Sequence, residues 1–174
     1  MTTHNDLKST ITPHDAAAVA AARAWAEARA RLLYDGKVVA HRSCGVAIAE
    51  SFGRDGRPYV GLRRGGLTGE ATCGAIGAGV LVLGEIFGAE DPASPSTPAL
   101  VAAVTRYQAL WQARLQRGAA RTVVCNDLTG QFAAFGSPER HAFCTDIATE
   151  VAGCVAQVMV EQGVDVARLV PPTR

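Results

Sequence analysis

The five cysteines of this sequence are its best candidates for chemistry: Cys44, Cys73, Cys125, Cys144 and Cys154. A thiolate can ligate a metal, attack an electrophile or pair with a second thiol. None of the five forms a C-x-x-C pair, so the spacings typical of zinc ribbons, thioredoxins and bacterial ferredoxins are absent. We expect a cytosolic chain, in which thiols stay reduced and structural disulfides are rare. The cysteines therefore indicate metal binding or redox chemistry.

Three of the cysteines fall near the expected beginnings of helices. Cys44 lies in the first turn of one predicted helix, Cys73 near the start of the next, and Cys144 in the second turn of the last. The partial positive charge at a helix N-terminus favours a thiolate, so we expect lowered thiol pKa values at these positions. Cys125 is expected in a turn between two helices.

Cys154 is predicted to stand apart from the other cysteines. It lies ten residues after Cys144 in the same predicted helix, which places it about 15 Å further along the axis. It cannot share a compact centre with Cys144, and we interpret it as a small buried hydrophobic residue. The candidate set is therefore Cys44, Cys73, Cys125 and Cys144.

Glycine is concentrated around Cys73. Half of the 18 glycines lie in residues 61–88, although a glycine inside a helix costs about 1 kcal/mol relative to alanine. One helical face would carry Cys73, Gly77, Val80, Leu81, Gly84 and Gly88. We expect a partner helix or a prosthetic group to approach this face. Tight helix packing without chemistry and a subunit interface, as in a homodimer, remain alternatives.

The elements that position these residues are predicted to be helical. Helical periodicity, capping residues and Gly or Pro boundaries predict five helices, at 13–34, 44–52, 71–87, 97–118 and 137–163. The first begins at a Thr12-Pro13 cap. We expect a loop at 54–69, a short extended piece and Asx turn at 123–127, and a frayed tail at 164–174. The sequence thus predicts one all-α domain over residues 1–174, a bundle of about five helices with a Gly-rich central helix.

Composition excludes several classes of partner. A net charge of +1 gives no long-range attraction for a nucleic acid or an anionic membrane. Residues 1–12 are polar, and the only long apolar run, residues 71–88, is short for a membrane span and contains Glu85. We therefore expect no nucleic-acid partner, no membrane insertion and a cytoplasmic location.

The order of the cysteine segments resembles a known family. Ser43-Cys44-Gly45, Gly69 to Ala75 with Cys73, the Cys125-Asn126-Asp127 segment and Cys144 are similar to the C_GCAxxG_C_C family of redox-active proteins, over residues 44–160. The N-terminal helix at 13–34 lies outside the motif, and Ala78 stands where the motif has its last glycine.

The resemblance implies a function for the four cysteines. The family shares its cysteine domain with split-Soret cytochromes c, which implies an iron–sulfur cluster on a helical scaffold. Carried over by position, its ligands would be Cys44, Cys73, Cys125 and Cys144, most simply around a 2Fe–2S centre used for electron transfer with a redox partner or a small substrate. Three alternatives remain: a dithiol pair with Cys73 as the attacking thiol, a structural Zn²⁺ site on the same four, and a helical interaction module whose thiols only pack.

Other polar residues stand near the cysteines in sequence. His41 and His141 each precede a candidate cysteine by three residues and could give a proton or act as substitute ligands; solvated helix-start histidines are the alternative. Glu70 could exchange protons with a thiol or serve only the helix dipole. The basic loop with Arg54, Arg57, Arg63 and Arg64 could admit an anionic substrate, dock an acidic redox partner, or simply be solvated.

Overall fold

The computed structural model describes residues 15–169, and within them it is helical, as predicted. The helices of eight or more residues are α1 (Ala16–Asp35), α2 (Cys44–Ser51), α3 (Gly74–Phe87), α4 (Pro98–Arg114) and α6 (Pro138–Glu161). Three shorter elements join them: η2 (Arg57–Leu62), α5 (Cys125–Thr129) and η3 (Val166–Leu169). These results confirm the all-α fold.

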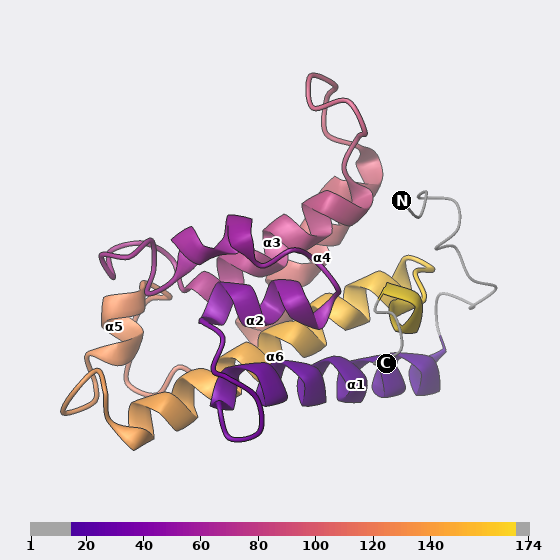
Figure 1. Cartoon of the computed structure of the whole chain (residues 1–174). Helices are drawn as coiled ribbons and strands as arrows, with labels where there is room; N and C mark the ends of the chain where they lie inside the picture. Colours follow the sequence, from indigo (N-terminus) through magenta and orange to yellow (C-terminus); the bar gives the residue numbers. More distant parts are fainter. Residues whose placement is uncertain (1–14, 170–174) are drawn as a thin grey trace.

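The two longest helices form the base of the bundle. α1 and α6 run antiparallel along each other, and α2, α3 and α4 lie over them (Figure 1). Asp15 caps α1 by accepting from the N–H groups of Ala17 and Ala18, while the predicted Thr12-Pro13 cap lies outside the described residues. Ser137 caps α6 as predicted, accepting from the N–H of Arg140. The beginnings of α2, α3, α5 and α6 gather at one end of the bundle, next to the end of α1.

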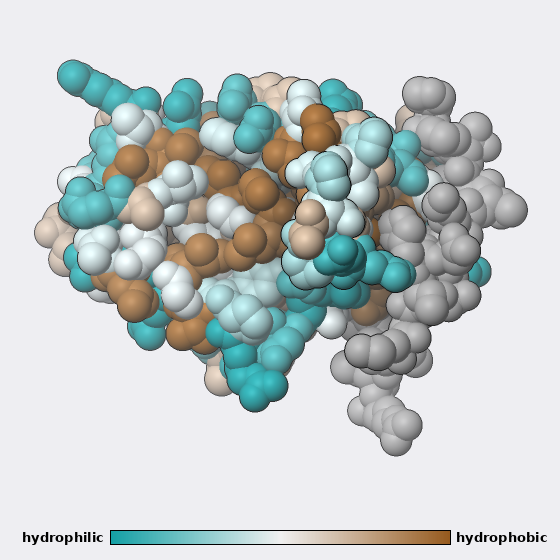
Figure 2. Space-filling model, turned by 90° about the horizontal axis from the view of Figure 1, so that it is seen from above, coloured by the Kyte–Doolittle hydropathy of each residue, from teal (hydrophilic) through white to brown (hydrophobic). Residues whose placement is uncertain are grey.

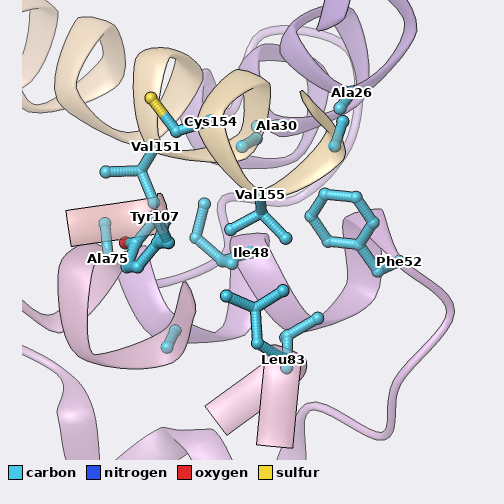
Figure 3. Packing of buried hydrophobic residues seen from close by; sticks show 14 of the residues in the cluster. Ala26, Ala30, Ile48, Phe52, Ala75, Leu83, Tyr107, Val151, Cys154 and Val155 are labelled. Carbon is cyan, nitrogen blue, oxygen red and sulfur yellow. The ribbon is translucent and has the colours of Figure 1, made fainter. Parts of the chain in front are cut away.

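The core is made of small and branched apolar side chains. Figure 3 shows Ile48 of α2, Leu83 of α3 and Val155 of α6 meeting in its centre, each fully buried. Alanines on α1, including Ala26 and Ala30, are fully buried as well, which lets α1 approach α6 closely. The Ala-rich sequence of α1 is thus explained by close packing between these helices.

The Gly-rich face of α3 differs from the prediction. A side chain at Gly77 would meet only one atom, at 3.8 Å, and one at Gly84 would meet nothing within 4 Å. Leu81, between them, is 46% exposed. Within the described residues no helix packs closely on Gly77, Leu81 and Gly84, so the expected approach of a helix of this chain is wrong at these positions. The approach of a prosthetic group or of a second subunit to them stays a prediction. Apolar residues are visible on the face seen from above (Figure 2).

Close approach occurs instead at other glycines of the region. A Cβ on Gly74 would lie 2.1 Å from the carbonyl oxygen of Leu62, and one on Gly79 would lie 2.3 Å from the Tyr107 hydroxyl. Tyr107 uses that hydroxyl to donate to the Ile76 carbonyl at 3.0 Å. The neighbouring Ala78, where the family motif has glycine, is fully buried.

Three predicted irregular segments contain helical turns. The loop at 54–69 includes η2, the segment at 123–127 becomes the start of α5, and the tail at 164–174 includes η3. The tail is not frayed where it is described, because Val164, Val166 and Leu169 are buried; residues 170–174 lie outside the described part.

The helix predicted at 137–163, α6, is more apolar than the sequence pattern indicated. By length and composition α6 could cross a membrane, yet 72% of its most apolar window is buried inside the protein. The buried side of a core helix explains this composition.

Candidate functional site

One cavity brings together Cys44, Cys73, Cys125 and Cys144. It has a volume of about 110 Å³ and lies at the end of the bundle where α2, α3, α5 and α6 begin. Each of these elements supplies one cysteine at or near its first turn. The remaining lining is formed by Tyr34, His41, Ser43, Arg63, Arg64, Ala75, Leu128, Thr129, Phe135, Arg140 and Ile147.

A short backbone pairing holds two of the cysteines together. The N–H of Cys73 donates to the Val123 carbonyl at 2.8 Å, and the N–H of Cys125 donates to the Ala71 carbonyl at 3.0 Å. Thr72 and Val124 form an isolated antiparallel bridge between them. Because these bonds run in both directions, the chain just before α3 is fixed against the chain just before α5. The extended piece predicted at 123–127 exists, but it is shorter than expected.

Glycine is required for this pairing at two positions. Gly69 has φ +87°, and a Cβ there would lie 1.9 Å from the Asn126 side-chain oxygen. Gly65 has φ +55°, and its Cβ would lie 2.6 Å from the Cβ of Cys125. L side chains rarely adopt such backbone angles. The glycines before Cys73 therefore serve to fold the loop against Cys125.

Cys44 sits close to the start of α3. A Cβ on Gly74 would approach its Sγ to 2.7 Å, so only glycine lets α2 and α3 meet at this point. Burial raises the pKa of the Cys44 thiol above its ordinary value, and the N–H of Arg64, which faces the same sulfur, offsets part of this rise. Arg64 reaches this position with φ 52°, in the left-handed region, which is uncommon for a residue with a side chain.

Cys144 is faced by a positively charged side chain and by a hydroxyl donor. Hydrogen bonding and positive charge from Arg140 lower its pKa, and the Tyr34 hydroxyl, the donor of a further hydrogen bond, lowers it as well. Burial opposes these effects and leaves the pKa of Cys144 above its ordinary value. Tyr34 lies near the end of α1, the helix outside the family motif. It is 4% exposed.

The thiol pKa values correct the expectation drawn from helix N-termini. The N–H groups of Ala75 and Ile76 do lower the pKa of Cys73, but burial and the negative charge of neighbouring thiolates raise it much further. Burial raises the pKa of Cys125 to about 11, and Cys44 and Cys144 add to the rise. Cys73 is therefore not a low-pKa attacking thiol. Among the four, Cys144 is the one supported by Arg140 and Tyr34 together.

Cys154 lies elsewhere, as predicted. It is fully buried on α6 and does not line the cavity. In Figure 3 its sulfur points away from Val155 and Ile48. Its neighbours are Arg23, with Nη1 at 4.0 Å, and Glu150, with Oε1 at 3.7 Å from its Sγ. It belongs to a polar contact between α1 and α6, which modifies the prediction of a purely hydrophobic role.

The two histidines hold the end of α1. His41 bonds through Nδ1 to the Tyr34 carbonyl, and His141 bonds through Nε2 to the Asp35 carbonyl at 3.0 Å. A carbonyl only accepts, so these nitrogens carry the protons. The Tyr34 ring lies 4.8 Å from the His41 ring and 5.4 Å from the His141 ring, centroid to centroid. Both histidines thus position Tyr34, a role that the sequence analysis did not foresee.

Glu70 is engaged in structure rather than in proton exchange at a thiol. It accepts from the Asn126 side-chain nitrogen at 2.6 Å, next to the backbone bond from the Asn126 N–H to Gly69 at 2.9 Å. The contact supports the pairing between Cys73 and Cys125.

The sulfurs are not arranged as a preformed site for one ion. Among the described residues, no group of three or more His, Cys, Asp or Glu side chains could hold a metal ion as it stands. A closed zinc site needs four ligands at about 2.0–2.3 Å from one point. The donor set is four thiols around one cavity, and soft thiolate ligands suit Zn²⁺, Cu(I) and iron–sulfur centres.

The comparison with protein families agrees with this geometry. Residues 42–158, more than half of the chain, match the family model described as "Putative redox-active protein (C_GCAxxG_C_C)". The chain belongs to this family. No curated protein and no solved structure matches it. The match includes all four cavity cysteines and also Cys154, and it begins after Tyr34.

Proposed function

We propose that the chain is an electron-transfer protein whose cavity cysteines, Cys44, Cys73, Cys125 and Cys144, hold an iron–sulfur cluster of the 2Fe–2S type. The observation that carries the proposal is the convergence of four thiols from four elements on one cavity of about 110 Å³. Such a cluster takes four cysteine thiolates and supplies one-electron chemistry when bound. Each iron of such a cluster would take two cysteine thiolates, so the protein would not need to place three side chains around a single metal ion.

The electrostatics of the cavity favour a cationic centre over isolated thiols. Burial raises the pKa of each cavity cysteine, and for all but Cys144 the charge of neighbouring cysteines adds to the rise. Several thiolates become favourable together only when positive charge lies among them, and metal ions supply that charge. Because the pKa values of the cavity thiols are raised, a single thiol in this cavity is poorly ionised at neutral pH and therefore a weak nucleophile.

The chain contributes support around the sulfurs. Backbone N–H groups of Arg64, Ala75 and Ile76 face the sulfurs of Cys44 or Cys73. The Tyr34 hydroxyl and Arg140 face Cys144. Donors of this kind stabilise negative charge on ligating sulfur and tune a reduction potential.

The test is an analysis of anaerobically purified protein for iron, acid-labile sulfide and visible absorption. We expect brown protein with iron and sulfide in equal amounts and absorption that bleaches on reduction. Colourless protein with stoichiometric zinc would replace the proposal by a structural zinc site. Metal-free protein whose cavity thiols form a disulfide under mild oxidation would replace it by dithiol chemistry.

A further inference from the structure

The cavity wall carries positive side chains and no carboxylate. Arg63, Arg64 and Arg140 line it, and no Asp or Glu of residues 15–169 does so. His41 is the histidine that lines the cavity, and its Nδ1 donates a hydrogen bond to the Tyr34 carbonyl. Outside the sulfurs themselves, a molecule entering the cavity meets only positive or neutral groups.

The basic loop of the sequence divides into two pairs of arginines. Arg57 lies 3.0 Å from Asp55, and Arg54 lies 3.9 Å from Glu85, so these two are ion-paired away from the cavity. Arg63 and Arg64 are exposed and form no salt bridge with any carboxylate of the described chain. Of the four arginines of this loop, the two without a salt bridge to a described carboxylate are thus the two that line the cavity.

Aromatic stacking holds two of the guanidinium groups at the mouth. The Arg64 guanidinium lies 4.8 Å from the centre of the Phe135 ring, and that of Arg140 lies 4.3 Å from it. Arg140 also donates from Nε to the Phe135 carbonyl. Stacking on a ring face leaves the N–H edges of the Arg64 guanidinium available to an anion. Arg140 uses part of its N–H edge on Phe135 and Cys144 and adds its positive charge. Phe135 therefore orders two positive groups that come from distant parts of the chain.

We propose that this mouth, formed by Arg63, Arg64, Arg140 and Phe135, binds a small anionic redox reactant that exchanges electrons with the cysteine centre. The inference rests on the proposed redox function and adds the charge class of the reactant. A planar guanidinium suits carboxylates and oxyanions in particular, because it donates two parallel hydrogen bonds.

The neighbouring charges favour a small anion over a broad acidic protein surface. Glu70 follows the loop of Arg64, and Glu139 precedes Arg140; both are exposed. A partner with an extended acidic face would meet these carboxylates together with the arginines. A small anion can reach the arginines of the cavity wall, which carries no carboxylate.

Two oxidants of opposite charge test the proposal. Protein reduced with dithionite and freed of excess reagent is mixed with ferricyanide, an anion, or with tris(phenanthroline)cobalt(III), a cation. Each oxidant gains one electron as the centre loses one; a dithiol would consume two equivalents and release two protons. We expect the double variant Arg63→Gln/Arg64→Gln to lower the rate of oxidation by ferricyanide about tenfold, which is within the range of electrostatic steering. The rate of oxidation by the cobalt complex should stay unchanged or rise. Arg57→Gln removes the same kind of charge from the same segment and should change neither rate.

The inference would be overturned by a ferricyanide-to-cobalt rate ratio that is the same in the double variant and the wild type. If both rates were unchanged, the arginines would have no part in the reaction. If both rates changed by the same factor, the arginines would only set the potential of the centre. Iron and sulfide are measured in the same samples. If they are absent, the proposed cluster fails, but reduced thiols still react with both oxidants and the rate ratio still decides the inference.

Discussion

The backbone N–H of Cys73 donates to the Val123 carbonyl at 2.8 Å, two residues before Cys125. Together with the reciprocal bond from Cys125 to Ala71, it makes two cysteines that are far apart in sequence into neighbours. The cavity therefore depends on backbone geometry before α3 and α5 as much as on the helices themselves.

Gly69→Ala should disrupt this pairing. The new side chain would clash with Asn126, and the φ of +87° would be strained for alanine. We expect a loss of about 1–3 kcal/mol in the free energy of unfolding, together with loss of bound metal, measured by urea denaturation and iron analysis. The matched control is Gly84→Ala in α3, where nothing lies within 4 Å. It should gain up to about 1 kcal/mol from helix propensity; equal effects of the two substitutions would contradict this account.

Cysteine substitutions should separate the cavity from Cys154. Cys73→Ser should lose most of the iron and sulfide of the proposed cluster, because it removes one of the four proposed ligands in the cavity lining. Cys154→Ser should retain them, since Cys154 lies against Arg23 and Glu150 instead. The iron and sulfide content and the visible spectrum of both variants are compared with those of the wild type. Equal losses would mean that Cys154 belongs to the centre.

Tyr34 should control the reactivity of Cys144. In the metal-free, reduced protein we expect Cys144 to be alkylated first, because Arg140 and the Tyr34 hydroxyl offset part of the pKa rise that burial causes. Tyr34→Phe keeps the ring between the histidines and removes the hydroxyl, so alkylation near pH 8 should slow by up to about tenfold. The order is read by iodoacetamide labelling and peptide mass spectrometry. Tyr59→Phe, which removes a buried hydroxyl bonded to Glu85, should leave the rate unchanged.

Alkaline pH should destabilise the metal-free, reduced protein. The folded-state pKa values of Cys125 and Cys154 are about 11, against an ordinary value of 9.0. Above pH 9 the unfolded chain releases thiol protons that the folded chain retains, so stability falls as the pH rises toward 11. Two pKa units correspond to at most about 3 kcal/mol for each thiol. Urea denaturation at several pH values measures the fall, and Cys154→Ser should reduce it; a flat profile would contradict the assigned burial.

The helices were predictable because their signals are local. Pro138 after the Ser137 cap marks the start of α6, and the apolar positions of α4 recur at helical spacing. The separation of Cys154 from the other cysteines followed from helix geometry alone, and the cavity confirms it.

The surroundings of the sulfurs were less predictable because they depend on long-range contacts. Tyr34 reaches Cys144 only after the chain between α1 and α2 folds back, with the Arg42 N–H donating to the Leu33 carbonyl at 2.8 Å. Phe135 joins Arg64 and Arg140 across the mouth. Neither hydrophobic periodicity nor the spacing of residues in the sequence predicts either contact. The direction of the thiol pKa shifts was wrong because burial outweighs the helix N-terminus.

Much of the buried core lies apart from the four cavity cysteines: Phe52, Leu83 and Val155 are fully buried and line no part of the cavity. If the cavity holds the proposed cluster, the scaffold can consequently mature in two stages, with the helices assembled first and the inorganic core inserted afterwards. Since each ligating thiol would have to surrender a proton, mild acid is then expected to strip the cluster while the bundle persists.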